Sequence, residues 1–308
     1  MLKVLVTVAL CLAMPALAEQ RFSFAAIGDM PYVRDDARLT DPEAERNRDF
    51  TGLIGRINAA GPAFTVHVGD TKSGSTVCTD AHLAYVRQLF DRFEAPLVYT
   101  PGDNEWTDCH RRGGDPLERL ARIRQVYFAW PQSLGRRTLP LAVQAGYPEN
   151  GRWSHGGVLF ATLHVPGSNN NRRLTDEFEA RNAAVLEWLR GTFARARAED
   201  AVAVALFMQA NPGWFCTRPE CTGSGGDGID GYRDLLAALD AELAAYSRPV
   251  LLVHGDTHVF SVDKPLMRDK RRVMNFTRLE VFGEDDTHAV LVGVTPDSPE
   301  VFSFLPLK

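Results

Sequence analysis

Basic excess, long apolar runs and closely spaced cysteines are all lacking in this chain of 308 residues, and each absence excludes a class of function. The net charge of −5 argues against broad binding to nucleic acids or anionic membranes, which needs basic patches. Past the first 18 residues no apolar run is long enough for a membrane-spanning helix. The five cysteines include no C-x-x-C pair, which argues against a thiolate zinc site.

The first 18 residues have the pattern of a signal peptide. Lys3 supplies a positive charge, residues 4–13 are apolar, and Ala16-Leu17-Ala18 fits the cleavage pattern before Glu19. We therefore expect a periplasmic or secreted protein without a membrane span. No repeat, linker or low-complexity block divides residues 19–308, so we predict a single domain there. The sequence leaves the oligomeric state open.

The mature chain keeps four cysteines: Cys78, Cys109, Cys216 and Cys221. An exported protein folds in an oxidising compartment, where these thiols form disulfides. Four cysteines allow three pairings, and we favour Cys78–Cys109 with Cys216–Cys221. The first bridge would tie the loop after Gly69-Asp70 to the loop after Gly102-Asp103-Asn104.

Strand-like apolar runs alternate with segments of helical spacing. The predicted strands are 22–27, 63–68, 96–100, 157–163, 201–208 and 249–254. The predicted helices are 41–60, 80–93, 116–130, 176–198 and 230–246. The glycine-rich residues 222–228 indicate a surface loop, and the tail 278–305 indicates three short strands without helices. Alternation followed by a strand-rich tail predicts an α/β fold with a largely β second layer.

Four predicted strands are followed by glycine and then a carboxylate. These segments are Gly28-Asp29, Gly69-Asp70, Gly102-Asp103-Asn104-Glu105 and Gly255-Asp256-Thr257-His258. The carboxyl edge of an open α/β sheet is where ligands bind. If the four ends converge, they form an oxygen-rich pocket suited to divalent metals. Four close carboxylates would repel one another without a cation, so we expect a metal.

The order of these segments resembles the calcineurin-like metallophosphoesterase superfamily, which includes purple acid phosphatases. Leu186-Glu187-Trp188-Leu189 is similar to the family's W-L helix before a buried strand. Gln209-Ala210-Asn211-Pro212 follows that strand, where the family usually has a histidine near a proline. The resemblance implies a four-layer αββα sandwich of two mixed β-sheets flanked by helices. It also implies hydrolysis of phosphate monoesters or diesters by a metal-bound hydroxide.

The family pattern is D-x-H, G-D, G-N-H-E/D, a histidine, and then G-H-x-H. Asp29 matches the first aspartate, Asp70 the bridging aspartate and His258 the last histidine. Pro31 replaces the histidine of D-x-H and has no side-chain ligand.

Three further departures replace imidazoles with oxygen donors. In the G-N-H-E/D segment, Asp103 stands at the position of the metal-binding Asn and Asn104 at that of the catalytic His. Gln209 or Asn211 lies near the position of the central His. Asp256 stands at the first His of G-H-x-H. Oxygen ligands favour magnesium, manganese or calcium, whereas imidazoles favour zinc or iron. We therefore predict one or two divalent ions of the harder kind, with iron or zinc as alternatives. The predicted ligands are Asp29, Asp70, Asp103, Asn104, Asp256 and His258.

The proton donor for the leaving group is unassigned, because Asn104 does not donate a proton as an imidazolium does; His110 is the candidate replacement. The candidate substrate-binding residues are Asn170, Gln209, Asn211 and His254. A plain turn is the alternative for Asn170, and a core histidine at a strand end for His254. We predict an exported metal-dependent hydrolase of small phosphate esters. The alternative is a degenerate member that binds metal or phosphate without turnover.

Overall fold

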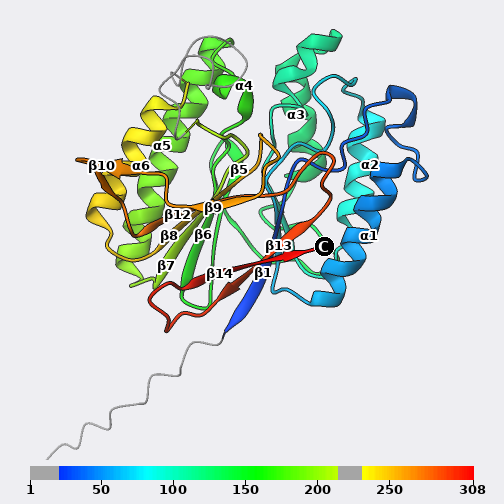
Figure 1. Ribbon diagram of the computed structural model, residues 1–308. Helices are drawn as coiled ribbons and strands as arrows, with labels where there is room; N and C mark the ends of the chain where they lie inside the picture. Colours follow the sequence, from blue (N-terminus) through cyan, green and yellow to red (C-terminus); the bar gives the residue numbers. More distant parts are fainter. Residues whose placement is uncertain (1–20, 214–230) are drawn as a thin grey trace, which may run out of the picture.

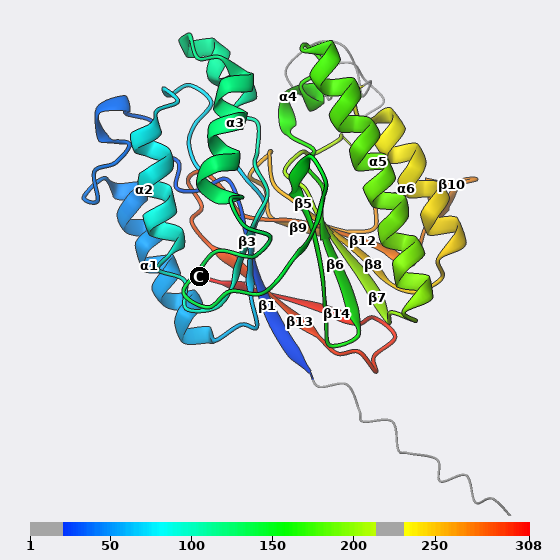
Figure 2. The same cartoon turned by 180° about the vertical axis from the view of Figure 1, so that it is seen from behind.

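Two large β-sheets lie face to face between two layers of helices (Figures 1 and 2). The computed structural model describes residues 21–213 and 231–308. The predicted signal peptide, the predicted loop 222–228 and the predicted Cys216–Cys221 bridge lie outside these residues. None of the helices in the described part is long and apolar enough to cross a bilayer.

The smaller sheet has five strands in the order β14-β13-β1-β2-β3. Its strands are β1 (Phe22–Ile27), β2 (Thr65–His67), β3 (Leu97–Tyr99), β13 (Ala289–Val294) and β14 (Phe302–Leu307). β1, β2 and β3 run parallel, so their carboxyl ends share one edge. β13 pairs antiparallel with β1, and β14 antiparallel with β13.

The larger sheet has seven strands in the order β4-β5-β6-β7-β8-β12-β9. Its strands are β4 (Ala142–Gln144), β5 (Tyr147–His155), β6 (Val158–Thr162), β7 (Ala203–Phe207), β8 (Val250–His254), β12 (Phe276–Glu280) and β9 (Ser261–Asp263). The four strands from β6 to β12 are parallel. β10 (Met267–Arg268) and β11 (Arg271–Arg272) form a separate small hairpin.

Helices cover the outer face of each sheet (Figure 1). On the smaller sheet these are α1 (Glu45–Ala60), α2 (Asp80–Phe90) and α3 (Pro116–Tyr127), and on the larger sheet α5 (Thr175–Ala198) and α6 (Arg233–Ala245). Among the described residues there are also three short helical turns: η1 (Asp36–Arg38), η2 (Thr107–Arg112) and α4 (Gly167–Asn170). The predicted αββα sandwich is therefore confirmed.

An aromatic core fills the space between the sheets. Phe24 of β1 packs edge-on against Phe160 of β6, with ring centroids 5.7 Å apart. Trp153 of β5 stacks on the other side of this cluster, 5.3 Å from Phe160 and 5.9 Å from Phe207. Because both sheets bury both faces, their parallel strands consist of nearly continuous apolar residues. This burial fixes the two sheets against each other and so fixes the edge where their strands end.

The sequence located most elements but missed the strands β4, β5, β9, β10 and β11. β5 has the sequence YPENGRWSH, which is polar and contains proline and glycine. Such a strand escapes an apolar-run criterion because it lies near the edge of the sheet and has two exposed residues at its end. The prediction for 41–60 also began four residues early, since residues 41–44 form a turn held by Asn47 through the Asp41 carbonyl oxygen.

The predicted Cys78–Cys109 disulfide is confirmed, with the two Cα atoms 5.7 Å apart. The bridge joins the loop after β2 to η2, which follows the loop after β3. Closing a loop of this length restricts the unfolded chain by roughly 3–4 kcal/mol in the chain-entropy model. The bridge thus ties together the two loops that carry Asp70 and Asp103.

Candidate metal and phosphate site

The two sheets touch at their carboxyl edges through Asp29 and Asp256. The Asp29 amide, just after β1, donates to the carbonyl oxygen of Gly69 after β2, at 2.8 Å. The Asp256 amide, just after β8, lies 3.1 and 3.2 Å from the two carboxylate oxygens of Asp29. The predicted convergence of strand ends from distant parts of the chain is therefore present.

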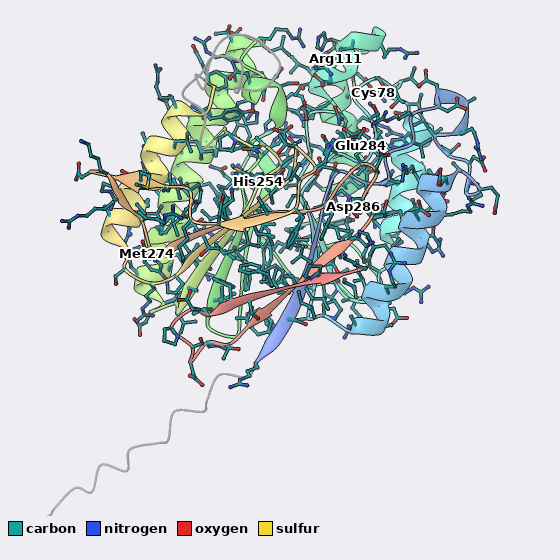
Figure 3. The ribbon with its side chains drawn as sticks, viewed as in Figure 1. Cys78, Arg111, His254, Met274, Glu284 and Asp286 are labelled. Carbon is teal, nitrogen blue, oxygen red and sulfur yellow. A yellow bond between two sulfur atoms is a disulfide. The ribbon has the colours of Figure 1, made fainter. Side chains whose placement is uncertain are left out.

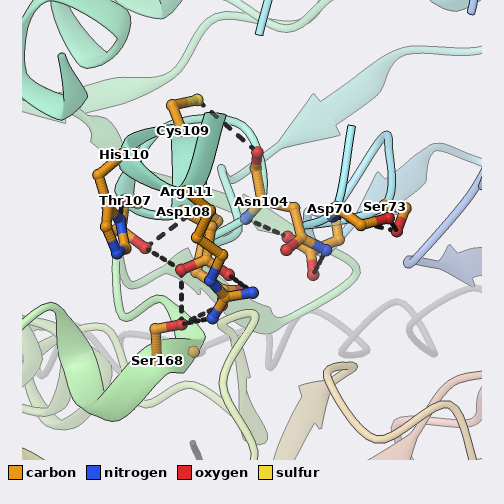
Figure 4. Close-up of polar contacts among 12 residues, drawn as sticks. Asp70, Ser73, Asn104, Thr107, Asp108, Cys109, His110, Arg111 and Ser168 are labelled. Carbon is orange, nitrogen blue, oxygen red and sulfur yellow. Dashed lines mark hydrogen bonds and ion pairs between the residues drawn. The ribbon is translucent and has the colours of Figure 1, made fainter. Parts of the chain in front are cut away.

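Asp70 links the smaller sheet to the larger one. Its Oδ1 accepts from the Asn104 backbone amide at 3.0 Å. Its Oδ2 accepts from Asn104 Nδ2 at 2.8 Å and from Gln209 Nε2 at 3.1 Å, and Gln209 follows β7 (Figure 4 shows the Asn104 contacts). Asp70 is 2% exposed. Two side-chain amides thus meet a buried carboxylate at the position where the resemblance implies a bridging ligand.

Asp103 and Asp256 direct carboxylate oxygens at the same space. A Cβ atom placed on Gly167 would stand 2.8 Å from Oδ1 of each. The other oxygen of Asp103 accepts from Ser168 Oγ at 2.7 Å, while Oδ1 is buried and has no hydrogen-bond partner among the described residues. Two like-charged oxygens therefore share a space that only a glycine leaves open.

His258 faces Asp29 with an unpartnered nitrogen. Its Nδ1 lies 3.0 Å from Glu284 Oε2, and Glu284 also pairs with Arg34 (Figure 3 labels Glu284). We assign the ring proton to Nδ1 from this contact. Nε2 then presents its lone pair 3.6 Å from Asp29 Oδ1, and within the described chain it has no hydrogen-bond partner. Two acceptors facing each other need a cation or a proton between them.

The site residues occupy backbone conformations that L-amino acids rarely adopt. Asp29, Asp70, Asp256 and His258 have φ values of 52°, 59°, 82° and 63°. Non-glycine residues in this left-handed region carry strain that typically concentrates at functional sites. Gly255 is required for a different reason, lack of space, because a Cβ there would overlap Asp29 Oδ2.

Burial and mutual repulsion raise the pKa values of the carboxylates. For Asp29, burial is the largest cause and Asp256 the second, and the pKa lies well above its ordinary value. Burial followed by Asp103 and Glu105 does the same to the pKa of Asp70. Burial and Asp103 raise the pKa of Asp256 to about 7. A divalent cation would relieve both the desolvation and the repulsion.

The candidate ligand atoms suit hard cations. They are carboxylate oxygens, the amide oxygens of Asn104 and Gln209, and one imidazole nitrogen. Two of these atoms, Asp103 Oδ1 and His258 Nε2, are buried without a hydrogen-bond partner among the described residues. As the side chains stand, no group of three His, Cys, Asp or Glu within residues 21–213 and 231–308 has the geometry to hold one ion. The amide NH₂ groups that occupy Asp70 account for part of this. A terminal amide that turns over presents its oxygen instead, but for Gln209 this breaks the hydrogen bond that its Oε1 accepts from the Gly167 amide. The residues therefore fit a metal by the chemistry of their ligand atoms, and a bound ion requires rearranged side chains.

The remaining predicted residues differ in how their contacts relate to this centre. The Asn211 backbone amide donates to Asp256 Oδ2 at 2.9 Å, which places Asn211 at the site. Asn170 is fully buried and bonds Gly231 O through Nδ2 and Arg181 through Oδ1, so its side chain holds the loop together. His254 is buried with Nδ1 2.9 Å from Gly255 O. His110 is exposed, with Nδ1 2.7 Å from Thr107 O.

Sequence reasoning missed Ser168 and Glu284 as partners of the site. Ser168 Oγ lies 2.7 Å from Asp103 and 2.9 Å from Asp108 Oδ1. The Glu284 amide donates to the Asp29 carbonyl oxygen at 2.9 Å, which brings its side chain beside His258. Tyr32 was also missed; its hydroxyl accepts from Asn104 Nδ2 at 2.5 Å. None of these stands in a motif, although Ser168 begins a Ser-Asn-Asn-Asn run next to Gly167.

Comparisons with known proteins give structural but not sequence relatives. No family model matches the sequence, and no curated protein matches it. Among solved structures, PhoD is 12% identical with a TM-score of 0.57, over 92% of this chain and 65% of that one. A dimetal phosphatase from Danio rerio is 12% identical with a TM-score of 0.54, over 93% of this chain and 98% of that one. A purple acid phosphatase from yellow lupin (Lupinus luteus) seeds is 10% identical with a TM-score of 0.54, over 94% and 54%.

These likenesses define the fold. The chain has the calcineurin-like phosphoesterase fold, so the predicted resemblance is confirmed at the level of architecture. It spans about two thirds of the length of the PhoD chain and about half of that of the lupin phosphatase, but nearly all of the zebrafish one. At 10–12% identity, the activity has to be argued from the residues of this chain.

Proposed function

We propose that this protein is a metal-dependent hydrolase of small phosphate esters. The observation that carries the proposal is the unpartnered His258 Nε2 facing Asp29 Oδ1 at 3.6 Å, at the contact between the two sheets. Two structural neighbours are a dimetal phosphatase and a purple acid phosphatase, which supports the same class.

Asp29, Asp70 and His258 would hold one divalent ion, and Asp103 and Asp256 would help to hold a second. Asn104, Gln209 and Asn211 supply further oxygens. Magnesium, manganese or calcium match this oxygen-rich set best. When bound, such ions acidify water and neutralise phosphoryl oxygens.

The protein's own groups orient the carboxylates and the proton positions. The Asn104 and Gln209 amides fix Asp70 between the sheets. The Tyr32 phenol, whose pKa burial raises far above its ordinary value, stays protonated and presents a neutral hydroxyl beside Asn104. The Asn104 side chain is also uncharged, so the positive charge that binds a phosphate has to come from cations.

Export remains part of the proposal. The Cys78–Cys109 bridge supports an oxidising compartment, since such bridges are rare in the cytosol. We also propose that residues 19–308 form one domain, with a small phosphorylated molecule as the substrate.

The test is a hydrolysis screen of purified protein with p-nitrophenyl phosphate and bis-p-nitrophenyl phosphate. Magnesium, manganese, calcium, zinc and iron are added back one at a time after chelation, and bound metal is measured by elemental analysis. We expect turnover that needs one of the metals and returns when that metal is restored. Background rates in every metal would contradict the proposal.

A binding protein without turnover is the second candidate. It is favoured by the amide groups that occupy both oxygens of Asp70, where a catalytic metal centre needs open ligands. Binding of metal or inorganic phosphate together with background hydrolysis would select it.

The pairing of Glu284 with His258 yields a separate prediction. Glu284→Ala removes the carboxylate that keeps the ring proton of His258 on Nδ1. The lone pair on Nε2 is then no longer kept available for a metal ion. Loss of such a partner costs about 10- to 100-fold in metal affinity. The measurement is manganese binding by titration calorimetry. Asp286→Asn is the matched control, because Asp286 is two residues away and bonds His288 instead (Figure 3); equal affinities in all three proteins would contradict the assigned role.

A further inference from the structure

Arg111 is a partly exposed cation beside the acidic site that takes no part in the proposed metal ligation. Arg111 lies in the last turn of η2, which follows Asp103, and its Nη1 pairs with Asp108 Oδ2 at 2.7 Å (Figure 4). The Asp108 side chain is 2% exposed, whereas that of Arg111 is 42% exposed. The guanidinium is therefore anchored at one end by a buried carboxylate and open to solvent over much of its surface.

Ser168 connects this arginine to the carboxylate cluster. Its Oγ lies 2.7 Å from Asp103 Oδ2 and 2.9 Å from Asp108 Oδ1, and Arg111 Nη2 lies 3.5 Å from the same oxygen. The φ angle of Ser168 is 50°, the first of four consecutive left-handed residues. A strained backbone thus holds the hydroxyl between Asp103 and the Asp108–Arg111 pair.

Gly74 shows how near the guanidinium lies to the position of the family's catalytic histidine. A Cβ added to Gly74 would stand 3.0 Å from Arg111 Nη1 and 3.1 Å from Asp108 Oδ2, and it would overlap Asn104 Oδ1. Arg111 and Asn104 therefore border the same small space. Asn104 is neutral, and the ammonium of Lys72 is buried and donates to the Ser73 carbonyl oxygen, so Arg111 places a solvent-accessible positive charge beside this space.

The charge of the site requires such a group. Asp29, Asp70, Asp103 and Asp256 repel an anion, and a phosphate that approaches them needs positive partners. A guanidinium has five N–H donors in a rigid fork that matches phosphate oxygens. The contacts of Arg111 with Asp108 and Ser168 involve only its two terminal nitrogens. Within residues 21–213 and 231–308 the guanidinium has no other hydrogen-bond partner, so its further N–H groups can meet a ligand.

We propose that Arg111 binds the phosphoryl group of the substrate and selects phosphate monoesters over diesters. The proposal deepens the proposed function and rests on it. A monoester has two negative charges and three terminal oxygens, whereas a diester has one charge and two such oxygens. A cation beside the site therefore gains more from a monoester.

The direct test is calorimetric binding of inorganic phosphate to the protein in manganese, without any turnover. Arg111→Met is compared with Arg112→Met, which removes the same charge one residue away. Arg112 bonds Ser75 O at 2.7 Å and Asp36 Oδ2 at 2.6 Å, away from the site carboxylates. We expect Arg111→Met to weaken phosphate binding about 10- to 100-fold and Arg112→Met to change it less than about twofold. Unchanged binding in Arg111→Met, or equal losses in both variants, would overturn the proposal.

Arg111→Lys separates ligand binding from neutralisation of Asp108. Lysine keeps the charge beside Asp108 but loses the fork, so the variant should unfold near the wild-type temperature and still bind phosphate weakly. Wild-type phosphate affinity in Arg111→Lys would show that only the charge matters and would overturn a fork-specific role.

Kinetics distinguishes failure of this proposal from failure of the proposed function. If the wild type is active, Arg111→Met should raise KM for p-nitrophenyl phosphate more than for the bis ester, and equal effects would overturn the selectivity. If no form is active but Arg111→Met alone loses phosphate, the hydrolase assignment fails and Arg111 remains a phosphate-binding residue.

Discussion

Replacing Asp70 with asparagine is expected to lower kcat/KM for p-nitrophenyl phosphate by about 10³-fold or more. Asp70 is the carboxylate that both sheets contact, through Asn104 and Gln209. The amide keeps the shape and one acceptor oxygen but removes the charge that the proposed cations need. Loss of a metal's transition-state stabilisation is worth several kcal/mol, and each 1.36 kcal/mol is tenfold in rate.

Asp297→Asn is the matched control for this experiment. Asp297 is exposed in the turn between β13 and β14. It comes three residues after Val294, the last residue of β13, which pairs with Phe22 at the start of β1. Asp297 therefore lies near the amino end of β1, whereas Asp29 follows its carboxyl end. Its substitution should leave the rate unchanged. An Asp70→Asn protein that is folded and retains more than about a tenth of the activity would contradict a ligand role for Asp70.

Asp256→Asn is expected to stabilise the metal-free protein at pH 8 by up to roughly 4 kcal/mol, and by little at pH 4. Burial and Asp103 raise the pKa of Asp256 in the folded state to about 7, above its ordinary value of 3.8. The folded state thus binds the proton more tightly than the unfolded state. Its contribution to stability is present below pH 4 and is lost as the pH rises through 7. Asparagine never ionises, so it escapes this loss.

The measurement is urea unfolding in the presence of a chelator at the two pH values. Glu187→Gln, an exposed change on α5, serves as the control and should shift neither curve. Adding manganese at pH 8 should stabilise the wild type and reduce the advantage of the variant. If Asp256→Asn destabilises the chelated protein at pH 8, carboxylate repulsion does not dominate this site.

The sequence predicted the centre of the site because its signal is local. Asp29, Asp70 and Asp256 each follow a glycine at a strand end, and parallel strands bring such ends to one edge. The αββα architecture was predictable for a similar reason, since apolar runs such as residues 203–207 read directly as buried strands.

The rest of the site depends on loop paths that no local pattern encodes. Ser168 reaches Asp103 across 65 residues only because four consecutive residues turn left-handed. Glu284 reaches His258 through the hydrogen bond of its own amide to Asp29. Arg111 stands in no motif, and it lies beside the site because its turn contains Cys109, which the disulfide ties to Cys78. β5 was missed because this polar strand, the second in its sheet, lacks an apolar run.

The central claim is that cations hold the carboxylates of the two sheets together. The most direct measurement is an anomalous difference map from a crystal grown with manganese. We expect at least one peak within about 2.5 Å of carboxylate oxygens of Asp29 or Asp70, with His258 Nε2 turned toward it. A map from a crystal saturated with manganese that has no peak near these side chains, with the Asn104 and Gln209 amides still bonded to Asp70, would contradict a cation-bridged site.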